Sequence, residues 1–434
     1  MTKKEIEKNV ELDNKKKLRV IEEVSKLLKE RYVFPEKATK MREILLRKYN
    51  EGNYDNIEKN GEFALEVDKT LKEISEDKHL FLLFNMELLK NETIRKSNNE
   101  EEKQKLENEL IENAKQTNFG FLKMEILNGN IGYLDLRAFH KSNEAFETAI
   151  AAMNFLSNTN SIIIDLRNNG GGEAEMVQLL TSYFLKMGSQ LNYIIRRYEN
   201  TTDQNWTLPY VPGKRMLNTK LFLLTSSNTF SAAEDFIYAL KCQKRAVIIG
   251  EKTKGGGHPV DFFPILETFL LMLPTAKSYN PICKDNWEKI GIEPDIPVPA
   301  KEALSKAHIL ALDDLILKEE NQTKKLFMKL AKEEASAISK LPEIDKINYQ
   351  ELAGIYEASD YGPTKIIWED GDLFWATKTI GNVKLTPITE KVFVSKQPGH
   401  DDLGFMFEQD IKTKELFLYY FYKRDYEVII KKKR

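Results

Sequence analysis

The sequence predicts an α/β core with a helical segment before it and a small antiparallel β-barrel or sandwich after it. From residue 119 onward, short β-rich runs alternate with helical runs of ten or more residues, which is typical of a sheet covered on both faces. Before that point the chain is charge-dense and helical in pattern. After residue 349 it becomes rich in aromatic residues and turns, which predicts antiparallel hairpins.

Length and composition predict a folded protein of several domains. The 434 residues exceed the roughly 250–300 at which a single hydrophobic core stops growing, so two or three domains are expected. Lys plus Arg number 65 and Asp plus Glu 67, which leaves a formal charge of -2 and no global field to attract nucleic acid or an anionic membrane. No stretch provides the roughly 18 consecutive apolar residues of a membrane span.

Residues 1–115 are expected to form a helical N-terminal domain. Apolar residues between 20 and 28 recur at helical spacing, Pro35 breaks that helix, and the stretch 63–74 repeats the amphipathic pattern. The N-terminus has no apolar leader region, so the sequence as printed predicts a soluble protein that stays inside the cell. A leader trimmed from a natural precursor is the alternative.

Three further domains follow in this prediction. Residues 116–300 form the α/β core, 301–348 a helical connector with a helix-like stretch over 302–341, and 349–434 a small β-barrel-like domain whose hairpins include the turn ED-GD. The core strands are expected in the runs KMEIL, GNIGYLDLRAF, SIIIDLR, KLFLLTS and RAVIIG, and its helices in EMVQLLTSYFLK and AAEDFIYALK.

The two cysteines, Cys242 and Cys283, are interpreted as plain thiols. Two are too few for a disulfide framework, and nothing near them fits a CxxC or zinc pattern. We therefore expect no structural metal.

The first candidate for chemistry is Ser231, which stands where an apolar strand and a short polar turn lead into a helix. A serine at such a turn is exposed, and the positive end of the helix can stabilise developing negative charge. Ser231 and Glu234 also fit the capping-box pattern SxxE, in which the serine only caps the helix. Taken alone, the segment favours the capping role.

Two glycine clusters and two histidines are the other candidates. Gly170 to Gly172 follow a buried-type strand, and their N–H groups could cradle an oxyanion. A plain glycine-rich turn and a phosphate loop are the alternatives, although neither nucleotide-binding motif is matched. Gly255 to Gly257 precede His258, for which the role of a base is conceivable, although taken alone an incidental loop histidine is favoured. His79 lies beside an apolar run and taken alone is structural.

Seven motifs follow one another in a characteristic order: KERYVFPEKATKM, DKHL, NFGF with GNIGYLDLRAF, IIIDLRNNGGG, TSSNTFSAAEDF, RAVIIGEKTKGGG and WEKIGIEPDIPV. Together, over about residues 18–300, they resemble the tail-specific and C-terminal-processing serine peptidases. The similarity is greatest to the branch containing the tricorn core protease and the interphotoreceptor retinoid-binding protein.

The resemblance implies a fold and a reaction. The core would be a crotonase- and Clp-protease-like superhelix of ββα units, and the chain would hydrolyse peptide bonds of peptides or unfolded proteins through a serine acyl-enzyme, without a cofactor. Carried onto this sequence, Ser231 is the nucleophile. The N–H of Ala232 and that of Gly171 or Gly172 would form the oxyanion hole.

The resemblance also implies which residue is the base. One branch uses a lysine 25 residues after the serine, but that position is Gly256 here. The tricorn-like branch uses a histidine near the N-terminus, matched by His79, and a glutamate, matched by Glu288. Lys254 is the competitor to His79; a polar glycine-rich loop does not provide the burial that a lysine base needs.

Two departures and two alternatives qualify the resemblance. Lys78 stands where the tricorn type has a serine, and residues 80–118 are too few for the PDZ domain of the processing proteases. The main alternative is a non-catalytic protein that binds an apolar ligand or a peptide on the same fold. A crotonase-like acyl-CoA enzyme is another. Residues 349–434 are expected to gate substrate or mediate homo-oligomerisation, with simple structural capping as the alternative.

Overall fold

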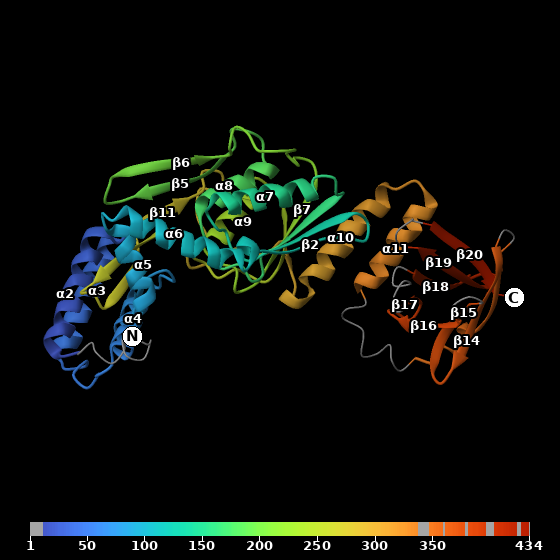
Figure 1. Cartoon of the computed structure of the whole chain (residues 1–434), viewed down its shortest axis with the longest axis horizontal. Helices are drawn as coiled ribbons and strands as arrows, with labels where there is room; N and C mark the ends of the chain where they lie inside the picture. Colours follow the sequence, from blue (N-terminus) through green and yellow to red (C-terminus); the bar gives the residue numbers. More distant parts are fainter. Residues whose placement is uncertain are drawn as a thin grey trace.

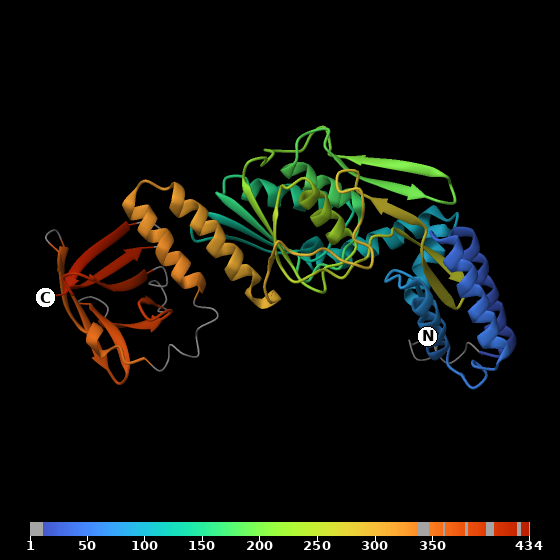
Figure 2. The ribbon, with the colours of Figure 1, turned by 180° about the vertical axis from the view of Figure 1, so that it is seen from behind.

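The computed structural model is elongated, with three parts in chain order along its long axis (Figure 1, Figure 2). A helical part lies at one end, an α/β part in the middle and a β-barrel at the other end. The structure describes residues 12–336, 347–358, 361–377, 381–395, 403–422 and 427–433. The start of the predicted N-terminal domain, residues 1–11, and the end of the predicted connector helix, residues 337–341, lie outside the described residues.

The N-terminal part packs helices against a small antiparallel sheet. Its helices are α2 (Asn14–Arg31), α3 (Pro35–Asn50), α4 (Asn60–Ser75), α5 (Met86–Lys96) and α6 (Glu100–Lys115). The sheet has the order β1-β10-β9, with β1 (Phe81–Leu83), β9 (Val260–Ile265) and β10 (Phe269–Pro274). Strands β9 and β10 come from the chain segment that was predicted as the core. Since Phe81 pairs with Met272 of β10, the residues just before β1 are held close to these two strands.

A six-stranded sheet forms the middle part. Its order is β12-β8-β7-β4-β3-β2, and every pair is parallel except β2 with β3. The strands are β2 (Phe121–Leu127), β3 (Ile131–Leu136), β4 (Ser161–Asp165), β7 (Lys220–Thr225), β8 (Val247–Gly250) and β12 (Ile296–Pro297). The loops after β4 and β7 leave the carboxyl edge of this sheet, where open α/β sheets place their ligands.

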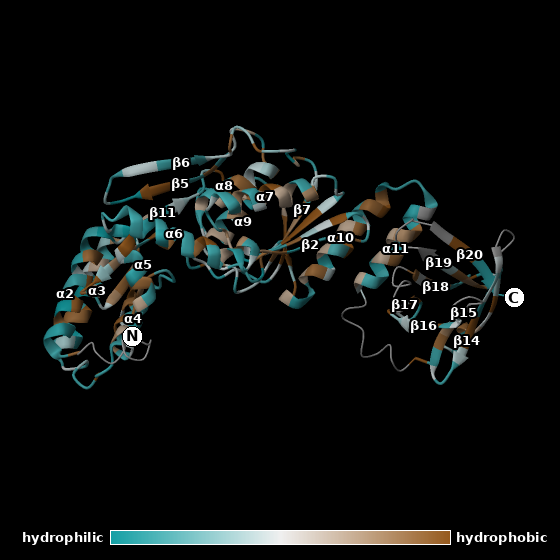
Figure 3. Ribbon diagram, in the orientation of Figure 1, coloured by the Kyte–Doolittle hydropathy of each residue, from teal (hydrophilic) through white to brown (hydrophobic). Residues whose placement is uncertain are grey.

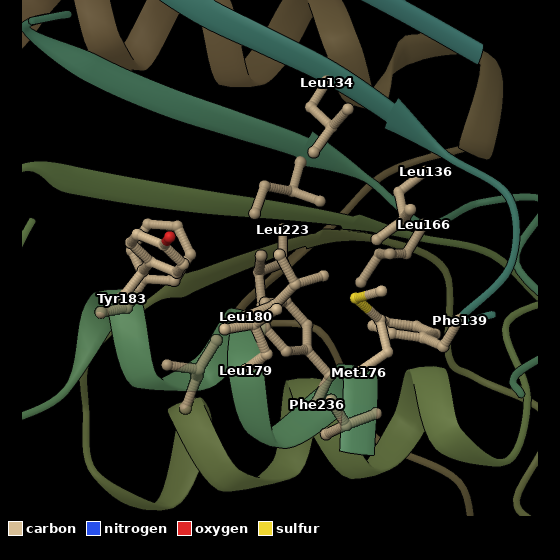
Figure 4. Close-up of a cluster of buried hydrophobic side chains, with 14 of the residues drawn as sticks. Leu134, Leu136, Phe139, Leu166, Met176, Leu179, Leu180, Tyr183, Leu223 and Phe236 are labelled. Carbon is tan, nitrogen blue, oxygen red and sulfur yellow. The ribbon is translucent and has the colours of Figure 1, made fainter. Parts of the chain in front are cut away.

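Helices cover both faces of the sheet. On one face lie α7 (Asn143–Leu156), α8 (Ala174–Phe184) and α9 (Ala232–Cys242), which contribute to one buried apolar cluster. Figure 4 shows the part of this cluster that lies between the sheet and helices α8 and α9. On the other lies α10 (Ala303–Lys318), whose alanines contact the opposite side of the same strands. The buried strands beside label β7 are brown in Figure 3, while the N-terminal helices carry much hydrophilic colour. The predicted α/β core with covered faces is confirmed.

A second small sheet, of order β11-β5-β6, flanks the core. It contains β5 (Gln190–Arg196), β6 (Thr201–Trp206) and β11 (Ala276–Tyr279), all antiparallel. Arg197, just after β5, donates to the carbonyl oxygens of Lys29, Glu30 and Tyr32, so the N-terminal part is tied to the core at this sheet.

The C-terminal part is a closed antiparallel barrel, reached through α10 and α11 (Gln322–Ser336). Its strands are β13 (Gly354–Ala358), β14 (Tyr361–Glu369), β15 (Asp372–Thr377), β16 (Gly381–Pro387), β17 (Val392–Ser395), β18 (Leu403–Gln409), β19 (Leu416–Tyr422) and β20 (Glu427–Lys433). Asp370 and Gly371 join β14 to β15 with φ of 52° and 88°, as a two-residue hairpin turn requires. The barrel is thus confirmed, whereas the exact domain boundaries stay predictions.

The interpretation of the cysteines as plain thiols is wrong. Cys242, at the end of α9, and Cys283 are joined by a disulfide across a sequence separation of 41. Their pairing depends on a tertiary approach that spacing alone does not reveal. Within the described ranges, no helix has both the length and the hydrophobicity needed to cross a bilayer.

Candidate active site

Ser231 lies at the sharp turn between β7 and α9, with an unusual backbone conformation. Its φ is 56° and its ψ is -122°, a region that L-residues rarely occupy. The turn is held by Phe230, whose N–H donates to the Asn169 carbonyl oxygen at 3.1 Å. Strain of this kind persists only where the surroundings enforce it, and it is typical of a serine presented at a strand-to-helix turn.

The buried carboxylate of Glu234 connects α9 to the loop after β8. It accepts the N–H of Ser231 at 2.9 Å, as a capping box requires, and also the N–H groups of Gly255 and Gly256 at 2.6 and 2.9 Å. Thr253 Oγ1 donates a further hydrogen bond at 2.5 Å. Burial raises the pKa of Glu234 despite these donors. The capping contact therefore positions the Ser231 backbone and occupies its N–H.

The glycine turn after β4 lies directly against Ser231. A Cβ placed on Gly171 would be 2.8 Å from Ser231 Cβ, and the φ of Gly171 is 107°, so only glycine fits. An oxyanion hole shared by the two segments requires such a close approach, whereas the roles of the individual N–H groups stay predictions. Asn169, fully buried, holds the turn: its Oδ1 accepts the Gly171 N–H at 2.9 Å and its Nδ2 donates to the Leu136 carbonyl oxygen.

The backbone N–H groups of Gly172 and Ala232 are free to donate to an oxyanion, unlike that of Gly171, which already donates to Asn169. The bridge between Phe139 and Gly172 uses the Gly171 carbonyl and the Glu173 N–H, and neither of these bonds involves the N–H of Gly172. Ala232 is the first residue of α9, so its N–H precedes the intrahelical bonds. Of the three predicted oxyanion-hole donors, Gly172 and Ala232 are thus the better placed, because the Gly171 N–H is already used.

His79 is buried beside the serine turn. It is 5% exposed, and its ring stacks on that of Phe230 with centroids 4.4 Å apart. Burial lowers the pKa of His79 to about 4, with smaller contributions from His258 and Lys254 in the same direction, while Asp77 opposes the shift. The imidazole is therefore neutral at physiological pH. Its Nδ1 is buried and has no hydrogen-bond partner.

Asp77 is a site residue that the sequence reasoning missed. Its Oδ1 accepts the backbone N–H of His79 at 3.0 Å, and its Oδ2 lies 3.3 Å from the Tyr32 hydroxyl, which donates to it. Burial opposes ionisation of Asp77, but contact with His258 and the His79 N–H outweigh it and hold the Asp77 pKa below its usual value. Asp77 stands two residues before His79 in the motif DKHL, a spacing that could have indicated it.

His258 is not the incidental loop histidine that the sequence suggested. It is 2% exposed, its Nδ1 lies 2.9 Å from Asp77 Oδ2, and its ring meets that of Phe34 edge-on. The same Nδ1 is 3.5 Å from Glu288 Oε2. His258 thus connects the two carboxylates that flank His79.

Glu288 lies in the same buried cluster. Its Oε2 accepts the N–H of Gly257 at 2.7 Å, while its Oε1 is buried without a partner. Burial raises the pKa of Glu288, and Asp77 adds to the shift, whereas His258 and the Gly257 N–H oppose it. One ligand atom each of Asp77, His79 and Glu288 lie within 4.8 Å of one another. The structure brings the predicted histidine and glutamate together without a hydrogen bond between His79 Nδ1 and Glu288 Oε1.

That cluster has the residue types of a metal site, but the carboxylates are already engaged. Both Asp77 oxygens and one Glu288 oxygen accept hydrogen bonds from protein groups. An arrangement of neutral imidazole beside hydrogen-bonded carboxylates is suited to accepting and returning a proton.

Ser231 and His79 line one cavity of about 500 Å³. Gly172, Ala232 and His258 also line it. Lys254 does not; it is exposed, with its Nζ 4.6 Å from the centre of the Phe230 ring, and its carbonyl oxygen accepts a hydrogen bond from Lys78. Lys78, which stands where the tricorn type has a serine, thus donates a hydrogen bond to the loop after β8.

Comparisons with known proteins place these residues within known sequence families. Residues 130–298 match the model of peptidase family S41, and residues 11–119 match that of the N-terminal domain of Peptidase_S41 in eukaryotic IRBP. The chain is 30% identical over 175 residues to carboxyl-terminal-processing peptidase 2, chloroplastic, of Arabidopsis thaliana, covering 39% of this chain and 32% of that protein. It is 29% identical to the carboxyl-terminal-processing protease of Synechocystis sp., covering 38% and 37%. The chain thus spans about a third of the length of these relatives.

Solved structures show weaker similarity. The photosystem II D1 C-terminal processing protease has a TM-score of 0.34 at 25% identity, covering 39% of this chain and 43% of that one. A lipoprotein from Streptococcus agalactiae has a TM-score of 0.47 at 16% identity, covering 69% and 96%.

Proposed function

The chain belongs to peptidase family S41, and from this we propose that it is a serine peptidase in which Ser231 attacks the peptide carbonyl. The observation that carries the proposal is the position of Ser231: a strained serine lies at a helix N-terminus and shares a cavity with a buried, neutral histidine. A structural cap has no need of this conformation, since cap residues ordinarily adopt extended dihedrals.

The proposed reaction begins with proton transfer from the Ser231 hydroxyl to His79 as the oxygen attacks the carbonyl carbon. The resulting oxyanion is stabilised by the N–H groups of Gly172 and Ala232, each worth about 3 kcal/mol in comparable enzymes. His79 then donates the proton to the leaving amine. Water then attacks the acyl carbon as His79 accepts one of its protons. His79 returns this proton to the Ser231 oxygen as the ester bond breaks, which releases the acid and restores Ser231 and neutral His79.

Glu288 and Asp77 are proposed as positioning residues for His79. The unpartnered Nδ1 of His79 and Oε1 of Glu288 are both buried, and in the proposed reaction they form a hydrogen bond when His79 becomes charged. Catalytic hydrogen bonds are often long before substrate binds. Asp77 fixes the backbone of His79 and contributes negative charge that favours the imidazolium.

The proposed substrates are peptides or unfolded proteins. The chain would bind them without a PDZ domain between His79 and the core. Residues 81–115 fold as β1, α5 and α6, and these elements occupy that stretch of the chain. The alternative, a non-catalytic binding protein on the same fold, requires a cavity but no reactive serine.

Peptide hydrolysis by point variants tests the proposal. We expect His79→Ala to lower the acylation rate by orders of magnitude and Lys254→Ala to change it little, because Lys254 is exposed and outside the cavity. Equal activity of wild type and His79→Ala, or loss of activity only in Lys254→Ala, would contradict the assignment of the base. Peptide binding without turnover by the wild type would support the binding-protein alternative.

A further inference from the structure

An acidic side chain lies in the cavity wall one helical turn after Ser231. Asp235 lines the cavity, and its backbone N–H donates to the Ser231 carbonyl oxygen at 3.0 Å. Residues four apart on a helix share a face, so Asp235 lies on the same side of α9 as Ser231. This carboxylate has no part in the proposed proton transfer.

The hydrogen bonds of Asp235 leave much of its acceptor capacity unused. Both of its oxygens accept from one donor atom, Asn192 Nδ2, at 2.8 and 2.9 Å. A carboxylate offers about four acceptor positions. Asn192 is in turn fixed by Asn205, directly opposite on β6, whose Nδ2 donates to Asn192 Oδ1 at 2.7 Å. The amide is thus oriented to keep its donor toward Asp235.

Among the described residues, none neutralises the negative charge of Asp235. Of those that line the cavity, none is Lys or Arg, whereas a second acid, Glu173, is among them. Within the part of the chain that the structure describes, no cation forms an ion pair with Asp235; its polar contact is the Asn192 amide. Burial raises the pKa of Asp235 to about 6, so the group is still mostly ionised at neutral pH. A desolvated carboxylate gains most from a cation.

The cavity lining provides a further polar group and apolar surface. Ser278 on β11 is 3% exposed, lines the cavity, and has an Oγ without a partner. On β11 it pairs with Ile194 of β5, which lies two residues after Asn192 and on the same face of that strand. Met272 and Trp287 add apolar surface. Such walls suit an aliphatic stem with a charged end.

From these contacts we infer that the cavity accepts a lysine or arginine side chain of a peptide, from a residue next to the bond that Ser231 attacks. The inference rests on the proposed peptidase function and makes Asp235 the residue that determines specificity. The ammonium or guanidinium group donates to Asp235 and to Ser278 Oγ, and the stem lies along Met272 and Trp287.

Matched peptides that contain arginine or its neutral isostere citrulline test the inference. Arginine or citrulline is placed in turn directly before and directly after the scissile bond, and kcat/KM is measured for each peptide. The wild type is expected to prefer arginine by about tenfold to a hundredfold at one position, the usual range for a charged hydrogen bond. Asp235→Asn should abolish this preference. Glu173→Gln, a neutralised acid of the same cavity, should keep it.

Two further measurements separate the possible failures. A neutral fluorophosphonate probe reports the nucleophile independently of side-chain preference. The affinity of Ser231→Ala for the same peptides reports the pocket independently of catalysis. A labelled wild type that hydrolyses both peptide series equally overturns the inference and leaves the peptidase assignment intact. If the wild type is neither labelled nor active, the peptidase assignment fails, and equal affinities for the two series then overturn the inference as well.

Discussion

The imidazole of His79 occupies the space that a side chain at position 256 would need. A Cβ placed on Gly256 would be 2.5 Å from His79 Cε1 and 2.3 Å from the Phe230 ring. Position 256 is 25 residues after Ser231, where relatives with a lysine base carry that lysine. A histidine stacked on Phe230 and a side chain at 256 therefore exclude each other, which supports His79 as the base.

The first prediction concerns this exclusion. Gly256→Ala is expected to displace His79 and to lower the rate of fluorophosphonate labelling at least tenfold, since misplacement of about 1 Å can cost a hundredfold. Gly362→Ala in β14 is the control, because a Cβ there meets nothing within 4 Å, its φ is not in the left-handed region, and Gly362 does not line the cavity. Equal labelling of the two variants would show that His79 is not held against Gly256 in solution.

The second prediction is the pH dependence of acylation. His79 must be neutral to accept a proton, and its pKa is lowered to about 4 by burial. The labelling rate should therefore stay level between about pH 5 and 7 and fall as the pH drops through about 4, where the imidazole becomes protonated. Circular dichroism at each pH identifies acid unfolding. A midpoint near the ordinary histidine value of about 6.5 would contradict the buried, neutral state.

The third prediction concerns Asp77 and His258. His258→Ala leaves the buried Asp77 carboxylate without its closest hydrogen-bond partner and should lower the free energy of unfolding by about 1–3 kcal/mol. The double variant His258→Ala with Asp77→Asn should be less destabilised than the sum of the single variants, because the uncompensated charge is removed too. Urea unfolding measures all four proteins. Strict additivity would mean that the two groups do not interact.

The fourth prediction concerns the disulfide between Cys242 and Cys283. Closing a loop of 41 residues is expected to contribute about 4 kcal/mol by the chain-entropy model. A reducing agent should therefore lower the unfolding midpoint of the wild type, while Cys242→Ala should be insensitive to it. Such bonds are uncommon in the cytosol, so the disulfide favours an oxidising compartment over the intracellular location expected from the sequence. A midpoint unaffected by the reductant would count against the bond.

Local patterns in the sequence were enough to predict the fold class and the serine turn. The alternation of strands and helices predicted the covered sheet, and the turn Asp370-Gly371 is formed as its sequence requires. Ser231 and the glycines around Gly171 were found because each stands at a strand end, and the carboxyl ends of β4 and β7 share one edge. The order of the motifs therefore predicts the contact between the glycine turn after β4 and Ser231 after β7, because the topology of the sheet brings these two loops together.

The parts that the sequence did not reveal depend on contacts between distant loops. Asp77 and His258 are 181 residues apart and meet because β1 pairs with β10, which no local pattern indicates. The disulfide was missed for the same reason. Glu234 looked like a capping residue, and its bonds to Gly255 and Gly256 appear only once the loop after β8 has folded over α9.

Site mapping of a fluorophosphonate adduct tests the central claim most directly. After labelling of the native protein, peptide mass spectrometry should locate a single adduct on Ser231. Ser231→Ala should fold with a loss of about 1 kcal/mol from the altered helix start and should not be labelled. An adduct on another residue, or labelling of Ser231→Ala at the wild-type rate, would contradict the assignment of Ser231 as the nucleophile.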